Sequence, residues 1–194
     1  CEVNTYKTDE YFASTPPLEA KKLLFSEFSA TARNPAFKSD EYILSFVDIK
    51  KAYFNGIPKR NVHLAFPKEL GIADNFCAHL KRCVYGTRDA GAIWEECYAT
   101  ALVEMGFTRG VASPCCFFHN DLRLMVVVHG DDFTCLGPKK NVVHYEDQLA
   151  SRFEIKRRGH IGESDGCIKE IRILNRILRL TDEGLRYEAD PRHA

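Results

Sequence analysis

The chain has 194 residues, enough for one domain with a sizeable core, alone or with an appendage. Lys and Arg together number 27, as do Asp and Glu, so the formal net charge is zero. Nucleic-acid-binding domains usually carry excess positive charge, so this balance argues against a self-sufficient domain of that class but leaves open a basic groove on one face. No apolar run is long enough to span a bilayer, so no membrane partner is expected.

The start of the chain and its cysteines narrow the class further. The first residues are polar, without a signal-peptide pattern, and the chain begins with Cys1 instead of Met, which is typical of a piece of a longer polypeptide. The 8 cysteines include no C-x-x-C pair, so we expect reduced thiols and no structural zinc.

The first predicted elements are a helix and a buried strand. Apolar side chains repeat at i, i+4 and i+8 (Ala20, Leu24 and Phe28), which predicts a helix over 16–31. Residues 42–49 are apolar on both faces and are predicted as a central strand. The rest of the first half is predicted, in chain order, as a loop at 33–41, a turn at 55–56, strands at 62–66 and 76–84, and a helix over 90–105 with Asp89 as its N-cap.

The second half alternates hairpins and helices. We predict a hairpin of strands 115–119 and 122–129, a sharp turn at 130–132 into strand 133–136, a helix over 140–152, an edge strand at 153–157 and a final hairpin that turns at 175–176. Runs of adjacent strands separated by single helices favour an α+β fold in which helices cover one face of an antiparallel sheet.

Carboxylates at the ends of two predicted strands are the candidate chemical site. In V-V-V-H-G-D-D-F, Asp131 and Asp132 are adjacent, and a divalent cation would relieve their mutual repulsion. A plain solvent-exposed turn is the alternative for this pair, and a strand-end cap is the alternative for Asp48. We expect all three to converge in one acidic pocket. Two metal ions held there would activate an attacking hydroxyl and stabilise a leaving oxygen.

Several segments in collinear order carry a family resemblance. F-V-D-I-K-K-A-Y-F-N-G, V-H-L-A-F-P-K-E-L-G, L-K-R-C-V-Y-G-T-R-D-A-G-A-I-W, V-H-G-D-D-F and F-E-I-K-R-R-G-H-I-G follow one another along the chain. Together they resemble the reverse transcriptase domain of copia-type (pseudoviral) LTR retrotransposon Pol polyproteins. The third segment is similar to the family's Leu-Tyr-Gly-Leu-Lys-Gln-Ala-Pro-Arg-x-Trp block, and V-H-G-D-D-F stands where the family has Tyr-Val-Asp-Asp.

The resemblance implies a fold and a division of the chain. The implied fold is an α+β polymerase palm, an antiparallel sheet backed by helices, with partial fingers and most of the thumb missing. Residues 1–41 would form a fingers-side helix and loop, 42–160 the palm and fingers catalytic core, and 161–194 a hairpin with a truncated connection toward the thumb.

The resemblance also implies a reaction and its site. The chain would be an RNA-directed DNA polymerase fragment that adds deoxynucleotides to a primer 3′-hydroxyl. Asp48, Asp131 and Asp132 would be the catalytic carboxylates and, with the backbone carbonyl of Ile49, would hold two Mg²⁺ ions, for which Mn²⁺ can substitute. The implied partners are an RNA template, a DNA or RNA primer, dNTPs and the remaining Pol segments, RNase H and integrase. The implied location is intracellular, in a cytoplasmic virus-like particle or the nucleus.

Three further residues are predicted at the nucleotide. Tyr53 falls where the family has an aromatic steric gate that excludes a 2′-hydroxyl, with a core tyrosine as the alternative. Arg88 stands where the family has Lys and would touch phosphate, with a surface arginine as the alternative. Asp89 replaces the family's Gln, and a carboxylate is unfavourable beside a triphosphate, so the N-cap is its alternative use. The basic residues 156–158 are interpreted as a solvated strand end or a nucleic-acid contact.

Two rival functions remain from the sequence. Gly-Asp-Asp is the signature turn of RNA-dependent RNA polymerases, although Tyr53 argues against acceptance of ribonucleotides. A catalytically inactive retrotransposon remnant that binds nucleic acid is favoured by Asp89, by Gly91-Ala92 in place of Pro-Arg and by His129-Gly130 in place of Tyr-Val, and is opposed by the three intact aspartates. From the chain alone we expect weak or no processive synthesis.

Overall fold

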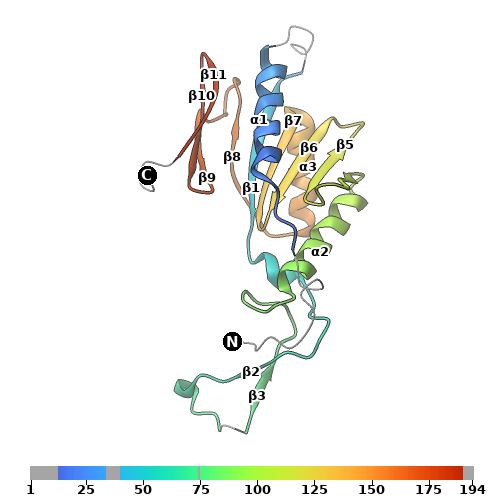
Figure 1. The fold of residues 1–194 in the computed structure, drawn as a ribbon, viewed down its shortest axis with the longest axis vertical. Helices are drawn as coiled ribbons and strands as arrows, with labels where there is room; N and C mark the ends of the chain where they lie inside the picture. The colour runs from blue at the N-terminus through green and yellow to red at the C-terminus, as the bar shows by residue number, and fades with distance from the viewer. Residues whose placement is uncertain (1–12, 34–39, 74, 190–194) are drawn as a thin grey trace. The chain divides into compact units, whose positions relative to one another are not determined.

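The computed structural model describes residues 13–33, 40–73 and 75–189, and Figure 1 shows the chain coloured along its sequence. The described residues form two compact units. One contains 13–14 and 51–100, and the other contains 15–50 and 101–189. The three-part division of the chain into 1–41, 42–160 and 161–194 stays a prediction.

The larger unit is built on a six-stranded sheet in the order β4-β5-β6-β7-β1-β8. All neighbouring strands in it are antiparallel. The predicted central strand is confirmed, because β1 lies between β7 and β8, and the predicted edge strand is confirmed in β8. The strands are β1 (Tyr42–Ile49), β4 (Thr108–Arg109), β5 (Cys116–His119), β6 (Leu124–His129), β7 (Asp132–Pro138) and β8 (Ile155–Ile161).

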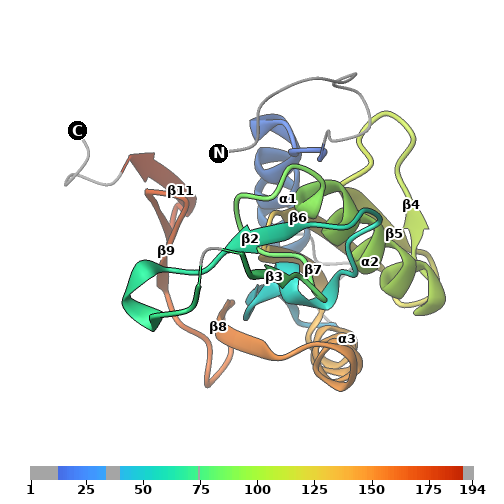
Figure 2. The ribbon, with the colours of Figure 1, turned by 90° about the horizontal axis from the view of Figure 1, so that it is seen from below.

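Helices cover both faces of this sheet, so the expectation that they lie on one face is wrong. Helix α1 (Leu18–Arg33) packs Leu24 and Phe28 against a core that contains Leu44 of β1. Helix α3 (Lys139–Arg152) instead contacts Ser45, which points to the opposite side of β1. Figure 2 shows α1 and α3 on opposite sides of β6 and β7. Because β1 is buried on both faces, its sequence is apolar throughout and gives no sign of which face a helix covers.

The C-terminal part of the larger unit forms a separate three-stranded antiparallel sheet, β11-β10-β9. Its strands are β9 (Glu170–Ile173), β10 (Arg176–Thr181) and β11 (Gly184–Ala189). The predicted turn at 175–176 is wrong by one residue, because Ile173 pairs with Arg176 and the turn residues are Leu174 and Asn175, both with positive φ. The polar sequence at 184–189 gave no prediction of β11, which has no fully buried position.

The smaller unit has little regular structure. It contains the 3₁₀ turns η3 (Ala52–Asn55) and η4 (Lys68–Leu70) and a ribbon of β2 (His63–Ala65) and β3 (Cys77–His79). The predicted strand over 76–84 is therefore real only over its first part, since Cys83 packs in a small core with Ala90 and Ile93. Helix α2 (Ala90–Glu104) matches the predicted helix over 90–105.

Two further observations concern the cysteines and the helices. The seven cysteines in the described part of the chain are all free thiols. Among the residues described, no helix has both the length and the apolar character that a bilayer crossing requires.

Candidate active site

The turn between β6 and β7 presents the first of the predicted carboxylates. His129 pairs with Asp132, so Gly130 and Asp131 form a two-residue hairpin turn. Gly130 has φ 64°, while Asp131 is not among the residues with positive φ. That pattern fits a type II′ turn, which requires glycine at its first central position and suits the twist of the flanking strands. The glycine therefore allows the chain to reverse directly at Asp131.

The sheet register brings the other two carboxylates to the same place. Asp48 at the end of β1 is the Cα partner of Asp132 at the start of β7. Directly opposed residues in an antiparallel pair have Cα atoms about 4.5–5.5 Å apart and side chains on the same face. In addition, the amide of Ile49 donates a hydrogen bond to the carbonyl of Asp131 at 2.9 Å. We call Asp48, Asp131 and Asp132 the carboxylate cluster.

The cluster lies within a row of charged and polar residues that crosses four strands. His129 of β6 pairs with Asp132, Asp132 pairs with Asp48, and Asp48 pairs with Lys156 of β8. All four lie on the face that packs against α1. Asp48 follows Leu44 and Phe46 of that core at two-residue steps, which places the three on one face of β1, and register partners share a face.

The electrostatics of the cluster are those of crowded negative charges. Burial raises the pKa of Asp131, and the neighbouring charges of Asp132 and Asp48 raise it further, against a hydrogen bond from its own backbone amide. Burial also lowers the pKa of His129, and the positive charge of Lys21 adds to this effect. Like charges so placed favour the binding of a compensating cation.

Two cationic side chains supply that compensation within the chain. Arg158 of β8 donates a hydrogen bond from Nη1 to Asp132 Oδ1 at 3.2 Å and another from Nη2 to the carbonyl of Arg172 at 2.6 Å. Arg158 occupies a β-bulge, since Phe46 pairs with Gly159 and Val47 pairs with Arg157. Lys21 of α1 is only 3% exposed. Burial lowers its pKa, the charge of Asp132 raises it and that of Arg158 lowers it.

The sequence interpretation connected neither cation with the carboxylate cluster. Lys21 lies three residues before Leu24 and seven before Phe28, on the apolar stripe of α1, and a lysine at such a position was the available signal. The interpretation of 156–158 as a solvated strand end holds for the exposed Lys156 and Arg157, although Arg157 also pairs with Glu146, and is incomplete for the half-buried Arg158, which binds Asp132. Gly159, the strand residue next to Arg158, was the available signal for a bulge, but it does not give the direction of the Arg158 side chain.

The donor chemistry of the cluster fits a hard divalent cation, because carboxylate and backbone carbonyl oxygens are its preferred ligands. The side chains, however, do not form such a site: among the residues that the structure describes, no group of three His, Cys, Asp or Glu side chains is placed to hold a metal ion. Asp132 is instead occupied by Arg158. The backbone thus brings the ligands together, while a cationic side chain satisfies one of them.

The predicted nucleotide-binding residues Tyr53, Arg88 and Asp89 all belong to the smaller unit. Tyr53 packs against the Cys83, Ala90 and Ile93 core, and its ring centroid lies 4.3 Å from that of Tyr85. Arg88 is half-buried.

Asp89 is buried immediately before α2, and its backbone carbonyl accepts a hydrogen bond from the Ile93 amide at 3.0 Å. Its side chain forms an ion pair with Arg60 at 3.3 Å. The position is therefore the predicted N-terminal one, but Asp89 Oδ1 is bound by Arg60, a residue that the sequence interpretation missed.

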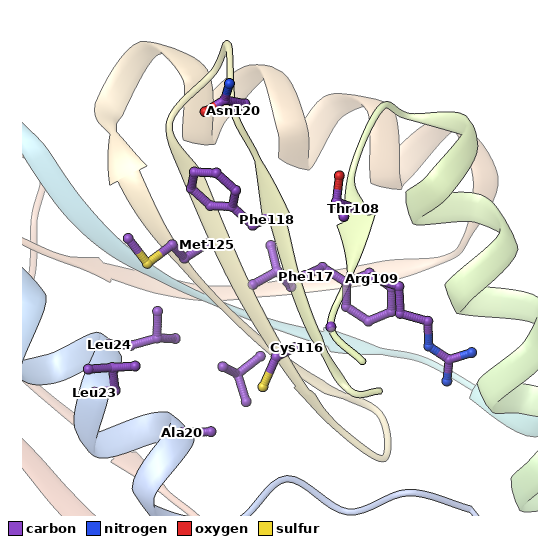
Figure 3. A pocket seen from close by; sticks show the side chains of 13 residues that line it. Ala20, Leu23, Leu24, Thr108, Arg109, Cys116, Phe117, Phe118, Asn120 and Met125 are labelled. Carbon is purple, nitrogen blue, oxygen red and sulfur yellow. The ribbon is translucent and has the colours of Figure 1, made fainter. Parts of the chain in front are cut away.

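The larger unit also contains an apolar cavity of about 510 Å³ between α1 and strands β4 to β6. Figure 3 shows Leu23 and Leu24 of α1 on one side of it and Phe118 and Met125 on the other. None of the carboxylate cluster lines this cavity. Its lining is mainly apolar, so the cavity is distinct from the candidate active site.

Comparison with known proteins gives a consistent assignment. Residues 22–181 match the family model described as "Reverse transcriptase (RNA-dependent DNA polymerase)". The chain is 26% identical over 130 residues to the Transposon Ty1-MR1 Gag-Pol polyprotein of Saccharomyces cerevisiae, an alignment that covers 65% of this chain and 7% of the relative. The Transposon Ty1-NL2 Gag-Pol polyprotein of the same yeast is 26% identical over 134 residues, or 67% of this chain and 7% of the relative. The chain thus matches about 7% of the length of these curated relatives.

Proposed function

We propose that this chain, which belongs to the reverse transcriptase (RNA-dependent DNA polymerase) family, catalyses addition of deoxynucleotides to a primer 3′-hydroxyl on an RNA template. Its similarity to Ty1 Gag-Pol polyproteins supports a place in the Pol polyprotein of a copia-type retrotransposon. Its partners would then be the template, the primer, dNTPs and the other Pol segments, within an intracellular virus-like particle.

The observation that carries the proposal is the pairing of Asp48 with Asp132 beside the Asp131 turn. Phosphoryl transfer requires little covalent chemistry from a protein and depends on position and charge. Two strand ends in a fixed register supply the position, and three carboxylates supply the charge.

In this proposal Asp48, Asp131 and the backbone carbonyl of Ile49 hold divalent cations, and Asp132 is the companion carboxylate. Mg²⁺ is the expected ion, and Mn²⁺ can substitute. When bound, the ions lower the pKa of the attacking hydroxyl and stabilise the leaving pyrophosphate. The chain's own part is to keep three negative charges close together, which the raised pKa of Asp131, caused by burial and by its neighbours Asp132 and Asp48, reflects.

Nucleotide selection is assigned to the smaller unit. Tyr53 would exclude the 2′-hydroxyl of a ribonucleotide, and Arg88 would contact phosphate. Asp89 was difficult to reconcile with a nearby triphosphate, but its ion pair with Arg60 neutralises the charge locally. This ion pair supports a nucleotide-binding role in which Asp89 organises the start of α2 and does not itself meet phosphate.

The test is primer extension on an RNA template with the purified 194-residue chain. We expect incorporation of dNTPs in preference to NTPs, and loss of incorporation in Asp131→Asn. Lack of dNTP extension by the wild-type chain would contradict catalysis by this chain, and preferred use of NTPs would favour an RNA polymerase.

Metal binding is the second measurement, because it does not require catalysis. Isothermal titration with Mn²⁺ should detect binding that Asp131→Asn abolishes. Glu183→Gln is the control, since Glu183 is an exposed carboxylate that pairs with Arg186. A wild-type chain that binds no Mn²⁺ would indicate the inactive remnant.

A further inference from the structure

Lys21 and Arg158 stand out as two cationic side chains beside the half-buried carboxylate cluster. Lys21 extends from the apolar stripe of α1 and is almost fully buried, although lysines are almost never fully buried unless paired. The negative charge of Asp132 raises the pKa of Lys21, against the lowering caused by burial. Arg158 lies on the edge strand β8 and contacts Asp132 of β7 across the intervening strand β1.

Lys21, Lys156 and Arg158 together carry as many positive charges as the carboxylate cluster carries negative ones. Asp48, Asp131 and Asp132 contribute three negative charges, and Lys21, Lys156 and Arg158 contribute three positive ones. Lys156 is the register partner of Asp48. A metal-free cluster without them would leave like charges close together and partly desolvated, which is costly.

Arg158 is anchored at both ends of its guanidinium. Nη1 binds Asp132, while Nη2 binds the carbonyl of Arg172 in β9. The hydrogen bond to the Arg172 carbonyl would hold the guanidinium near β9 when the hydrogen bond to Asp132 breaks. The bulge at Arg158 re-aims its side chain toward Asp132.

We propose that Lys21 and Arg158 are built-in counter-cations of the carboxylate cluster, which oppose the binding of a divalent cation, and that a cation that uses Asp132 must displace Arg158 from it. This inference rests on the proposed function, because it concerns regulation of the same metal site. It rests on the pairing of Asp48 with Asp132 and on the hydrogen bond that Arg158 donates to Asp132.

The experiment measures Mn²⁺ affinity of the full chain by isothermal titration, with the rise of the melting temperature on Mn²⁺ addition as a second readout. Removing a positive charge near the cluster should tighten binding. We expect Arg158→Gln and Lys21→Met to lower the Kd on the order of tenfold each. Lys21→Met keeps the buried aliphatic volume, and far-UV circular dichroism checks that each variant folds.

The controls separate charge from packing. Arg158→Lys and Lys21→Arg retain the charge and should stay close to wild-type affinity. Lys22→Met removes an exposed charge from the same helix, and Arg186→Gln removes one that pairs with Glu183 on the C-terminal sheet, so both should leave the Kd unchanged. A variant that only loosens the fold would weaken Mn²⁺ binding, which is the opposite sign.

Two results would overturn the inference, and they differ. If Asp131→Asn abolishes binding while Arg158→Gln and Lys21→Met bind Mn²⁺ no more tightly than wild type, the metal site stands and the counter-cation role is wrong. If neither the wild-type chain nor any variant binds Mn²⁺, the metal site of the proposed function fails, and the inference fails with it.

Discussion

Glu146 provides the sharpest test of how the fold holds β1 in place. It lies on α3 with its side chain only 2% exposed. Its Oε1 accepts hydrogen bonds from Ser45 Oγ at 2.5 Å and His160 Nε2 at 2.7 Å, and its Oε2 accepts one from Arg157 Nε at 2.8 Å. Through these contacts the Glu146 carboxylate joins α3 to β1 and β8. Its contact on β1, Ser45, lies three residues before Asp48.

Replacing Glu146 with Gln tests this joint with minimal change of volume. Gln keeps Oε1 as an acceptor for Ser45 and His160 but turns Oε2 into an amide donor that faces the Arg157 donor. Breaking a buried ion pair by removing one partner costs about 3–5 kcal/mol. Arg157 is 45% exposed and also binds Asp147 at 2.6 Å, so its share must be reduced for solvent screening. We therefore expect a loss of about 2 kcal/mol at neutral pH.

The loss should depend on pH with a definite sign. Burial raises the pKa of Glu146, but hydrogen bonds from His160, Ser45 and Arg157 outweigh it, so the net pKa in the folded chain lies below the ordinary value. A lowered folded-state pKa stabilises the fold above the unfolded-state pKa of about 4.3, and this contribution disappears as the pH falls through the lower folded-state value. The difference between wild type and Glu146→Gln should accordingly shrink in acid.

The assay is urea denaturation followed by far-UV circular dichroism, from about pH 7 down to about pH 3. Glu163→Gln is the matched control, because Glu163 pairs with Lys169 at the surface and should matter by no more than about 0.5 kcal/mol. A Glu146→Gln protein as stable as wild type at neutral pH, or a difference that persists in acid, would refute the reasoning.

Further predictions concern packing, the turn and the smaller unit. Leu24→Ala, at a position 3% exposed, should cost about 2–5 kcal/mol in urea denaturation, while Leu23→Ala, at a neighbouring position 65% exposed, should cost less than about 1 kcal/mol. Gly130→Val places a β-branched residue at positive φ and should cost about 1–2 kcal/mol and weaken Mn²⁺ binding; unchanged melting and titration curves would contradict the turn assignment. Arg60→Gln leaves the buried Asp89 without its ion-pair partner and should lower the melting temperature more than Asp89→Asn does; the reverse order would contradict the assigned pair.

Much of the fold was predictable because local patterns and tertiary structure agree. The strand over 42–49 was found with its observed ends because an apolar run on both faces has few alternatives. The prediction of strand over 76–84 failed at its second half, where Cys83 packs in a small core without a paired strand. Apolar composition records burial, and burial alone does not distinguish a strand from a packed loop. The side of the sheet that each helix covers is also absent from the sequence of β1.

The sequence predicted the carboxylates of the candidate site but not the cationic side chains beside them. Asp48, Asp131 and Asp132 follow strand ends, and pairing of those strands brings them together. Arg158 and Lys21 depend on tertiary detail, since one sits in a bulge and the other gains its burial only when α1 docks. Arg60 likewise approaches Asp89 from a segment 29 residues earlier in the chain. Such contacts form only in the folded backbone, and local signals such as a lysine on the apolar stripe of α1 do not identify the partner.

The departures from the family pattern bear on whether the chain is a decaying remnant. Drift would replace residues without regard to their surroundings, leaving buried charges and strained turns behind. Asp89 instead has Arg60 as its partner, and Gly130 occupies a position of positive φ that suits glycine better than any other residue. His129 extends the row that crosses the sheet at Asp132. These three departures are thus accommodated by their own neighbours, which favours a diverged but intact polymerase site over an eroded one.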